Sequence, residues 1–259
     1  MLLQDKVAVI TGAGRGIGRA IAQAYAREGA HLVLAARDVA ALEETRALVA
    51  EHERDVLVIE LDLREEESVR AMAEQALVHF GHVDILVNNS GIAGPTAPLW
   101  EIAPHEWRET LDVDLTGPYL CCHALLPSML ARRSGNILMI GSITGKRPLF
   151  ARTPYAAAKL GLVGLVRTLA WELGPHNIRV NLISPGPVEG ERIVRVIQNM
   201  ASIQGISQEE AQRLFLRDTP LARMIPPEDI ANAALFLASD LSGSTTGEDL
   251  NVSAGITMY

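Results

Sequence analysis

Two residues one helical turn apart could carry acid/base chemistry. Tyr155 and Lys159 stand at positions i and i+4 of the run YAAAK, so a helix would place both side chains on one face. A tyrosine with its ordinary pKa of about 10 is a poor base at neutral pH, and a nearby ammonium favours its phenolate form. Ser142 lies 13 residues before Tyr155, at the end of an expected strand, where its hydroxyl could hold a substrate oxygen. The three residues predict proton transfer at a carbonyl or alcohol oxygen, although a buried helix tyrosine and a turn serine would explain each one alone.

A glycine-rich loop lies near the N-terminus, at the end of another expected strand. Residues 11–18 read TGAGRGIG, and a helical pattern follows at once. A glycine backbone can approach a pyrophosphate closely, and a helix N-terminus offers free N–H groups and a positive dipole end. Such a loop can be a mere tight turn, but its length and position favour a dinucleotide site. We expect cofactor contacts from Gly12, Gly14, Arg15, Gly16, Ile17 and Gly18.

Three other strand ends are expected to complete the cofactor site. An aspartate after the third strand can accept a hydrogen bond from an adenine amino group, although it is often only a helix cap. The run NNSG after the fourth strand can fix the loop beside the ribose, and the turn SPGPV after the sixth can run past the nicotinamide. Within the sixth strand, Asn181 is expected to be structural. We therefore expect contacts from Asp62, Leu63, Asn89, Pro185, Gly186 and the amide of Val188, and from Tyr155 and Lys159 at the nicotinamide ribose.

The choice of dinucleotide is a question of charge at the end of the second strand. An acidic side chain there binds a ribose 2′-hydroxyl and repels a 2′-phosphate. The neutral Ala36 fills the position and Arg37 follows it, so Arg37 and Arg15 could clamp a 2′-phosphate. These arginines could instead be solvated, and Asp38 could cap the next helix, which we favour, or reach the ribose of NAD. The sequence predicts a preference for NADP(H), with NAD(H) as the alternative.

The composition excludes several classes of protein. The chain of 259 residues is 48% hydrophobic, which suits one large α/β core, and it has no unbroken apolar run of membrane-spanning length. A formal net charge of −8 without a long basic run argues against nucleic acid as the main partner. The two cysteines, Cys121 and Cys122, are adjacent, which disfavours a disulfide between them and makes no zinc site. The N-terminus lacks a secretory pattern, and we expect a cytoplasmic protein without a metal centre.

Short β-branched runs alternate with longer helical patterns along the chain. This alternation predicts an α/β fold with a doubly wound parallel sheet and helices on both faces, where ligands bind at the carboxyl ends of the strands. Strands are expected at residues 6–10, 31–35, 56–60, 83–87, 136–140, 178–183 and 249–252. Helices are expected at residues 16–28, 38–52, 66–79, 106–131, 154–173, 194–200, 208–217 and 227–238.

Together these motifs resemble those of the classical short-chain dehydrogenase/reductase family, over nearly the whole chain from Lys6 onward. The resemblance implies a single-domain Rossmann fold with a seven-stranded sheet of order 3-2-1-4-5-6-7, and a homotetramer. It also implies an oxidoreductase that moves a hydride between NAD(P)(H) and a carbonyl or secondary alcohol. In it, Ser142 positions the carbonyl, Tyr155 donates or accepts the proton and Lys159 lowers the tyrosine pKa. The chain is most similar to 3-oxoacyl-(acyl-carrier-protein) reductases and related small-alcohol dehydrogenases.

Two positions depart from the family pattern. The family usually has Asn-Asn-Ala-Gly after the fourth strand, and a small hydroxyl at Ser90 should be tolerated there. The long helix usually carries a catalytic asparagine in a stretch like VNLTG, whereas residues 113–117 read VDLTG and place Asp114 at that position. The asparagine is thought to anchor a water in the proton relay to the lysine, so Asp114 is expected to alter the relay. Asp114 could also be a polar residue lining a helix kink.

The substrate is expected to be set by residues 189–218, a mobile lid within the single domain of residues 1–259, and by the loop of residues 93–101. A sugar, a ring ketone, a β-ketoacyl thioester and a hydroxy acid all remain open. Four arginines could meet an anionic substrate or belong to a solvated face: Arg147, Arg152, Arg192 and Arg195.

Two other classes of function compete with an oxidoreductase. A dinucleotide-binding regulator or assembly partner without catalysis is suggested by Asp114, but such a protein has no physical need for an intact Ser142, Tyr155 and Lys159. A nucleotide-sugar epimerase or dehydratase usually has a longer chain, a separate C-terminal substrate domain and a different glycine spacing.

Overall fold

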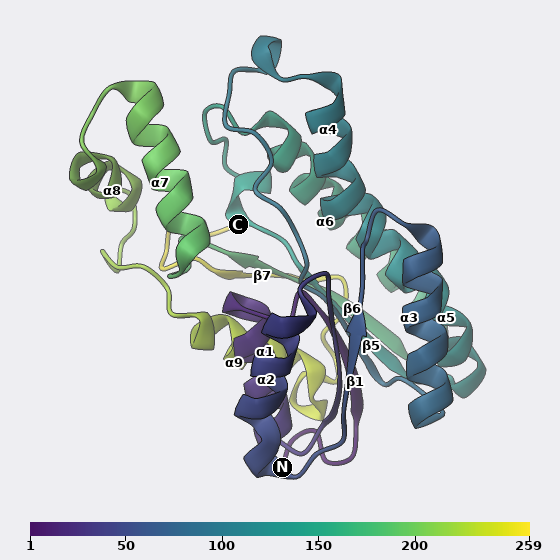
Figure 1. Cartoon of the computed structure of the whole chain (residues 1–259). Coiled ribbons are helices and arrows are strands. Elements are labelled where there is room, and N and C mark those ends of the chain that lie inside the picture. Colours follow the sequence, from purple (N-terminus) through teal and green to yellow (C-terminus); the bar gives the residue numbers. More distant parts are fainter.

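A sheet of seven parallel strands forms the centre of the protein, with helices on both faces (Figure 1). The computed structural model describes residues 1–259. The strand order is β3-β2-β1-β4-β5-β6-β7, which confirms the doubly wound Rossmann fold predicted from the sequence. The predicted strand ends lie within two residues of the observed ones: β1 Val7–Thr11, β2 His31–Ala36, β3 Val56–Glu60, β4 Ile85–Asn88, β5 Gly135–Ile140, β6 Ile178–Pro185 and β7 Asp249–Val252.

Nine helices connect and cover the strands. Their bounds are α1 Gly16–Arg27, α2 Val39–Val49, α3 Glu66–Phe80, α4 Pro104–Leu111, α5 Gly117–Arg132, α6 Thr153–Leu173, α7 Glu191–Gln204, α8 Gln208–Leu216 and α9 Pro227–Ala238. Asp38 accepts a hydrogen bond from the N–H of Ala41 at 3.1 Å and so caps α2, the role favoured from the sequence.

The sheet separates two hydrophobic cores, because alternate residues of a strand point to opposite faces. On one face, Val7 and Val9 of β1 belong to a core of 27 buried residues shared with α3, α5 and α6. On the other face, Ala8 and Ile10 belong to a core of 26 buried residues shared with α1, α2 and α9. Burial of both faces explains why the strands read as nearly continuous apolar runs. No helix combines the length and the apolar character that crossing a membrane requires.

The long helix predicted over residues 106–131 is present, but a π-helical turn lies in its middle. Helix α4 begins at Pro104, and a π-helical turn, Asp112–Thr116, separates it from α5. Pro118 has no N–H to donate to the carbonyl of Asp114, four residues earlier, so the regular hydrogen-bond ladder cannot continue there. The wider turn places Asp114 in the interior, fully buried.

Residues 189–218 form two helices that stand apart from the sheet (Figure 1). Helix α7 is longer than the predicted residues 194–200, and it packs against α8 around the buried side chains of Ile197, Ala201 and Ala211. This small core is separate from the two cores of the sheet. The pair of helices therefore has its own packing.

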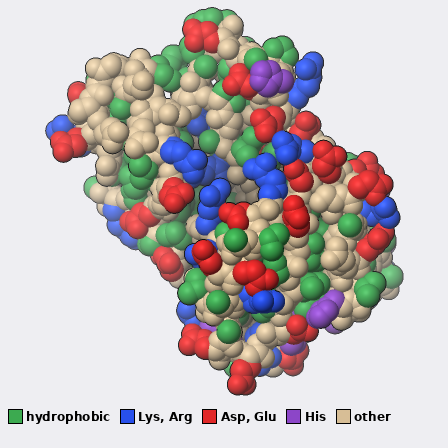
Figure 2. All heavy atoms as spheres, viewed as in Figure 1, with side chains coloured by type: hydrophobic (Ala, Val, Ile, Leu, Met, Phe, Trp, Pro, Cys, Tyr) green, Lys and Arg blue, Asp and Glu red, His purple; other side chains and the backbone are tan.

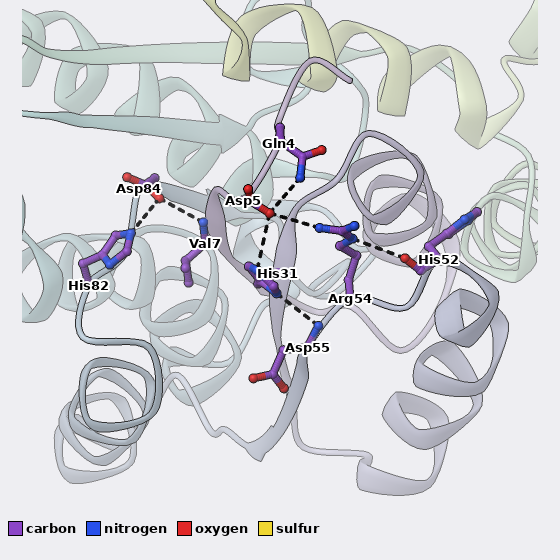
Figure 3. A network of polar contacts seen from close by, with 9 residues as sticks. All are labelled: Gln4, Asp5, Val7, His31, His52, Arg54, Asp55, His82 and Asp84. Carbon is purple, nitrogen blue, oxygen red and sulfur yellow. Dashed lines mark hydrogen bonds and ion pairs between the residues drawn. The ribbon is translucent and has the colours of Figure 1, made fainter.

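A polar network lies at the amino ends of the strands, at the opposite edge of the sheet from the glycine loop (Figure 3). The buried Asp84 carboxylate accepts hydrogen bonds from the N–H of Val7 and from Nη2 of Arg132, both at 2.9 Å, and lies 3.1 Å from Nε2 of His82. Burial raises the pKa of Asp84, but the Val7 N–H, Arg132 and His82 outweigh it and hold the pKa below its ordinary value. The network ties together chain segments that are far from the site described next.

Candidate active site

Helix α6 carries Tyr155 and Lys159, which are four residues apart and could together carry out acid/base chemistry. Tyr155 and Lys159 are buried, at 9% and 4% exposed, and Nζ of Lys159 lies 5.7 Å from the centroid of the Tyr155 ring. The same Nζ donates a hydrogen bond to the carbonyl of Ile140 at 3.1 Å. Because Ile140 is the last residue of β5, this bond fixes the ammonium at the carboxyl edge of the sheet.

Ser142 follows β5 closely and lies beside the tyrosine. It caps a short 3₁₀ turn, Ile143–Gly145, by accepting a hydrogen bond from the N–H of Thr144 at 3.1 Å. Its hydroxyl lies close enough to Tyr155 to lower the pKa of the tyrosine. The structure therefore brings Ser142, Tyr155 and Lys159 together at one point.

Opposing influences act on the proton of Tyr155. Burial raises its pKa and the Asp114 carboxylate raises it further, whereas the charges of Arg192 and Lys159 and the nearby Ser142 hydroxyl lower it. The lowering prevails, so the pKa of Tyr155 lies below its ordinary value. A phenol with a lowered pKa exchanges its proton more readily near neutral pH, as an acid/base group must.

Asp114 reaches this cluster from the π-helical turn. Its Oδ1 accepts a hydrogen bond from the N–H of Ile92 at 2.7 Å, and its Oδ2 lies 3.9 Å from Nζ of Lys159. Oδ2 is buried and has no hydrogen-bond partner within the chain. A Cβ at Gly91 would lie 3.0 Å from Oδ1 of Asp114 and 3.4 Å from Nζ of Lys159, so the glycine after β4 permits this close approach. The residue at the family's asparagine position thus lies beside the lysine.

Two arginines lie against the ring of Tyr155. The guanidinium carbon of Arg152 is 4.9 Å from the ring centroid, and that of Arg192, at the start of α7, is 5.4 Å from it. The other two arginines singled out in the sequence are engaged elsewhere, because Arg147 pairs with Asp218 and Arg195 pairs with Glu191. The sequence did not indicate that Arg192 would reach the tyrosine, since the contact depends on how α7 folds back.

The glycine loop connects β1 to α1 at the same edge of the sheet. Gly12 has φ +67°, and a Cβ at Gly18 would lie 2.2 Å from the carbonyl of Gly12. Both positions therefore need glycine for the helix to begin so close to the strand. Asn89 donates through Nδ2 to the carbonyls of Thr11 at 2.9 Å and Gly12 at 3.2 Å, while the N–H groups of Asn89 and Ser90 both donate to Oγ1 of Thr11. These bonds hold the loop after β4 against the glycine loop.

The start of α1 fits an anionic group such as the pyrophosphate of a dinucleotide. Arg15 at the N-cap makes no side-chain capping bond, and no acidic residue lies in the first turn. A Cβ at Gly16 would meet nothing within 4 Å, so the helix N-terminus opens outward. Free N–H groups with a positive dipole end favour a phosphate at such a place. Arg15 is exposed and Ile17 packs partly into the second core.

The adenine end of the predicted cofactor site shows one arrangement that the sequence did not indicate. Arg64 donates from Nε to both carboxylate oxygens of Asp62, at 3.0 and 3.2 Å. The Arg64 hydrogen bond is the main reason why the pKa of Asp62 falls to about 2. Leu63 is buried against Gly117, so only its backbone is available to a ligand. Arg37 is exposed, beyond the end of β2.

The turn after β6 is fixed by its neighbours at the other end of the site. Gly186 donates to the carbonyl of Val252 at 2.9 Å, and a Cβ there would lie 2.9 Å from the Cα of Ser253. Val188 forms an isolated bridge with Ile225 that uses the N–H of Glu189 and the carbonyl of Pro187, and the N–H of Val188 takes no part in it. Pro185 ends β6, and Asn181 bonds to the backbone of Thr245 and Glu248, in agreement with its predicted structural role.

Comparison with known proteins places this site in a family. Residues 12–257 match the family model described as Enoyl-(Acyl carrier protein) reductase. The 3-oxoacyl-[acyl-carrier-protein] reductase of Chlamydia trachomatis is 35% identical over 256 residues, which cover 98% of each chain. The crystal structure of NAD⁺-bound xylitol dehydrogenase has a TM-score of 0.95 at 28% identity, covering 98% of this chain and 100% of the other. The crystal structure of a single-substitution variant of actinorhodin polyketide ketoreductase with NADPH has a TM-score of 0.94 at 31% identity, covering 98% of each chain.

Three observations indicate the same family: the fold, the matches over nearly the whole chain, and the grouping of Ser142, Tyr155 and Lys159. The chain therefore belongs to the short-chain dehydrogenase/reductase family and is an oxidoreductase that transfers a hydride between a nicotinamide dinucleotide and a carbonyl or alcohol carbon.

Proposed function

We propose that Tyr155 is the acid/base of this oxidoreductase, that Ser142 holds the reacting oxygen of the substrate, and that Lys159 keeps the tyrosine pKa low. The observation that carries the proposal is the buried Tyr155 phenol, which contacts Ser142, has Lys159 one helical turn away and has a lowered pKa. When bound, the dinucleotide supplies or accepts the hydride. The chain's own task is to give a proton to the oxygen during reduction and to remove it during oxidation.

Each of the three residues has a distinct part in this proton transfer. The Ser142 hydroxyl can donate to the substrate oxygen and so orient it toward the Tyr155 hydroxyl. The Lys159 ammonium is held at the carbonyl of Ile140, from where its charge stabilises the phenolate that remains after Tyr155 gives up its proton. Asp114 holds the loop after β4 through Ile92 and opposes that stabilisation through its own charge.

The cofactor would be bound along the carboxyl ends of the strands. The start of α1 would hold the pyrophosphate, Asp62 and the backbone of Leu63 the adenine, Asn89 the ribose region, and the Pro185–Val188 turn the nicotinamide. We infer a preference for NADP(H), because Ala36 at the end of β2 is neutral and the Asp38 carboxylate is occupied as a helix cap. Arg37 just past β2 and Arg15 in the glycine loop are exposed cations.

Three further proposals concern the protein as a whole. The chain is one domain over residues 1–259, in which residues 189–218 serve as the substrate lid. It works in the cytoplasm, and it is a homotetramer, as its family resemblance implies. Its substrate is a small carbonyl compound or alcohol, and the relatives compared above are named for chemically different substrates, so relatedness alone does not select one.

The test of the proposed function is a panel of ketones and alcohols assayed with both dinucleotides, for the unaltered chain and for Tyr155→Phe. The substitution keeps the ring and removes the hydroxyl, so turnover should fall by at least about 100-fold. Dinucleotide affinity, measured by fluorescence titration, should change little. A Tyr155→Phe variant with nearly unaltered turnover would contradict the proposal.

A further inference from the structure

The two arginines at the Tyr155 ring differ from most other arginines of the chain in having no carboxylate partner. Arg147, Arg195 and Arg217, which lie near them in the sequence, pair with Asp218 or Glu191. Arg152 and Arg192 make hydrogen bonds only to uncharged groups. Both nevertheless lie within 5.4 Å of the ring that carries the acid/base hydroxyl.

Arg152 is a buried cation whose hydrogen bonding is incomplete. It is 3% exposed, and it donates to the carbonyl of Ala93 at 2.6 Å and to the hydroxyl of Thr96 at 3.4 Å. Its Nε is buried without a hydrogen-bond partner. Burying a charge without a counter-ion is expensive, and burial lowers the pKa of Arg152 accordingly. An anion at this place would offset that expense.

Arg192 approaches the same ring from the lid. Its only hydrogen bond within the chain joins Nη2 to the carbonyl of Ile92 at 2.9 Å, which connects α7 to the loop after β4. The remaining N–H groups of the guanidinium are free of partners within the chain. A planar guanidinium with free N–H groups fits a carboxylate through two parallel hydrogen bonds.

The balance of charge around Tyr155 is strongly positive. Arg152, Lys159 and Arg192 all lie within 5.7 Å of the ring centroid, and Asp114 is the acidic group among the main influences on the tyrosine pKa. Asp114 is already engaged with the N–H of Ile92 and lies beside Lys159. Figure 2 shows several Lys and Arg side chains around the hollow in the middle of the face in view, with some Asp and Glu side chains beside them.

We propose that the substrate carries a carboxylate, which binds between Arg152 and Arg192 while its carbonyl or alcohol group lies at Tyr155. The inference rests on the proposed function of this site and names the class of substrate: oxo acids and hydroxy acids. Both guanidiniums lie against the tyrosine ring, so the carboxylate is only a few bonds away from the reacting carbon. Arg192 lies at the start of α7 and Arg152 at the N-cap of α6, so a carboxylate bound to both would join the lid to the helix that carries Tyr155.

The test measures binding rather than turnover. Butanoate, benzoate and cyclohexanecarboxylate are titrated calorimetrically into the protein saturated with NADP⁺, each against its carboxamide, which has nearly the same shape and no charge. At least one carboxylate should bind about 10-fold more tightly than its carboxamide, as expected for a charge-assisted bond. If no carboxylate binds more tightly than its carboxamide, or if inorganic phosphate binds more tightly than all of them, the proposal is overturned.

Three variants assign the effect to residues. Arg192→Gln removes an exposed charge and should weaken carboxylate binding by about 10-fold while leaving the carboxamide unaffected. Arg195→Gln, one turn further along α7 and paired with Glu191, is the matched control and should change neither. Arg152→Gln should act in the same direction as Arg192→Gln, with its thermal unfolding measured to confirm that it folds. Equal effects of Arg192→Gln and Arg195→Gln would contradict the site.

Turnover of 4-oxopentanoate and its amide separates this inference from the proposed function. If carboxylates bind through the arginines but Tyr155→Phe retains activity, the acid/base assignment fails and the carboxylate site stands. If Tyr155→Phe is inactive and the unaltered chain reduces the amide as well as the acid, the acid/base assignment stands and the carboxylate site fails.

Discussion

The carboxylate of Asp114 and the ammonium of Lys159 lie beside each other in the interior, with Oδ2 of the aspartate 3.9 Å from Nζ of the lysine. A negative charge at this point opposes the effect of the lysine on Tyr155, because the Asp114 carboxylate raises the pKa of the tyrosine. An asparagine would make the same bond to the N–H of Ile92 without that charge.

Replacing Asp114 by asparagine should therefore lower the pKa of Tyr155. In the direction of carbonyl reduction Tyr155 must be protonated, so activity falls as the pH rises through its pKa. We expect Asp114→Asn to keep or gain activity and to shift this basic limb of kcat/KM to lower pH. Asp112→Asn, on the exposed side of the same π-helical turn, is the control and should leave the profile unchanged. A variant that binds cofactor normally but loses activity would make the carboxylate itself part of the relay.

Cofactor preference should respond to charge at the end of β2. Ala36→Asp combined with Arg37→Ser introduces a carboxylate for a ribose 2′-hydroxyl and removes a partner of a 2′-phosphate. Since each charge-assisted hydrogen bond contributes about 1.5–3 kcal/mol, the ratio of kcat/KM for NADPH to that for NADH should fall by at least about 10-fold. Arg46→Ser, on α2 and paired with Glu43, should leave the ratio unchanged. Equal use of both cofactors by the unaltered chain would count against an NADP(H) preference.

The glycine loop should tolerate no side chain at Gly18. A Cβ there would lie 2.2 Å from the carbonyl of Gly12, so Gly18→Ala must push α1 away from β1. We expect loss of dinucleotide binding in fluorescence titration and a lowered Tm. Gly164→Ala on α6, where a Cβ meets nothing within 4 Å, is the matched control and should raise stability by roughly 0.5–1 kcal/mol. Normal cofactor affinity in Gly18→Ala would show that the loop is not held by this contact.

Acid should destabilise the protein partly through Asp84. The pKa of this carboxyl is lower in the folded chain than its ordinary value, despite burial, because of the Val7 N–H, Arg132 and His82. Its contribution is therefore present above the pKa of the unfolded chain and is lost as the pH falls through the folded pKa. Asp84→Asn should be less stable near pH 7, by about 1–3 kcal/mol in urea unfolding, and should lose less stability on acidification. A parallel decline of both proteins with pH would exclude this role.

The protein should form a homotetramer in which some of its exposed apolar side chains are buried between subunits. Trp171 on α6 is 86% exposed, and Met258 and Tyr259 at the chain end are each 80% exposed, so these side chains are candidates for burial between subunits. Light scattering should give a mass near that of four chains of 28.0 kDa, and Trp171→Glu should reduce it. A mass near 28.0 kDa for the unaltered protein would refute the homotetramer.

Local signals in the sequence account for most of the fold. All seven strands were predicted, because each strand is a short apolar run beside a helical pattern, and Asp38 was favoured as a cap because capping depends only on neighbouring residues. The order of the strands came from the family resemblance. The π-helical turn was not predicted, although Pro118 gives a local reason for it. The missing N–H of a proline shows where the helical hydrogen bonds are interrupted, but not which backbone conformation the helix adopts there.

In the site, too, contacts between residues close in the sequence could be predicted, whereas contacts between distant segments could not. Ser142, Tyr155 and Lys159 lie within a short stretch of chain around β5 and α6, and their grouping could be predicted from spacing. Arg192 reaches the ring of Tyr155, and it bonds to the carbonyl of Ile92 across 100 residues. Only the folded chain defines these two contacts. The pairing of Asp62 with Arg64 needed the turn after β3, which spacing alone does not specify.

The separate packing of α7 and α8 has a consequence for how such a protein diverges. Because Ile197, Ala201 and Ala211 form their own small core, substitutions in this pair of helices disturb neither core of the sheet. After gene duplication, the two copies can therefore accumulate changes on the surface of these helices without disturbing either core of the sheet. New substrates can be acquired through this segment, while the strand ends keep the same cofactor chemistry across the descendants.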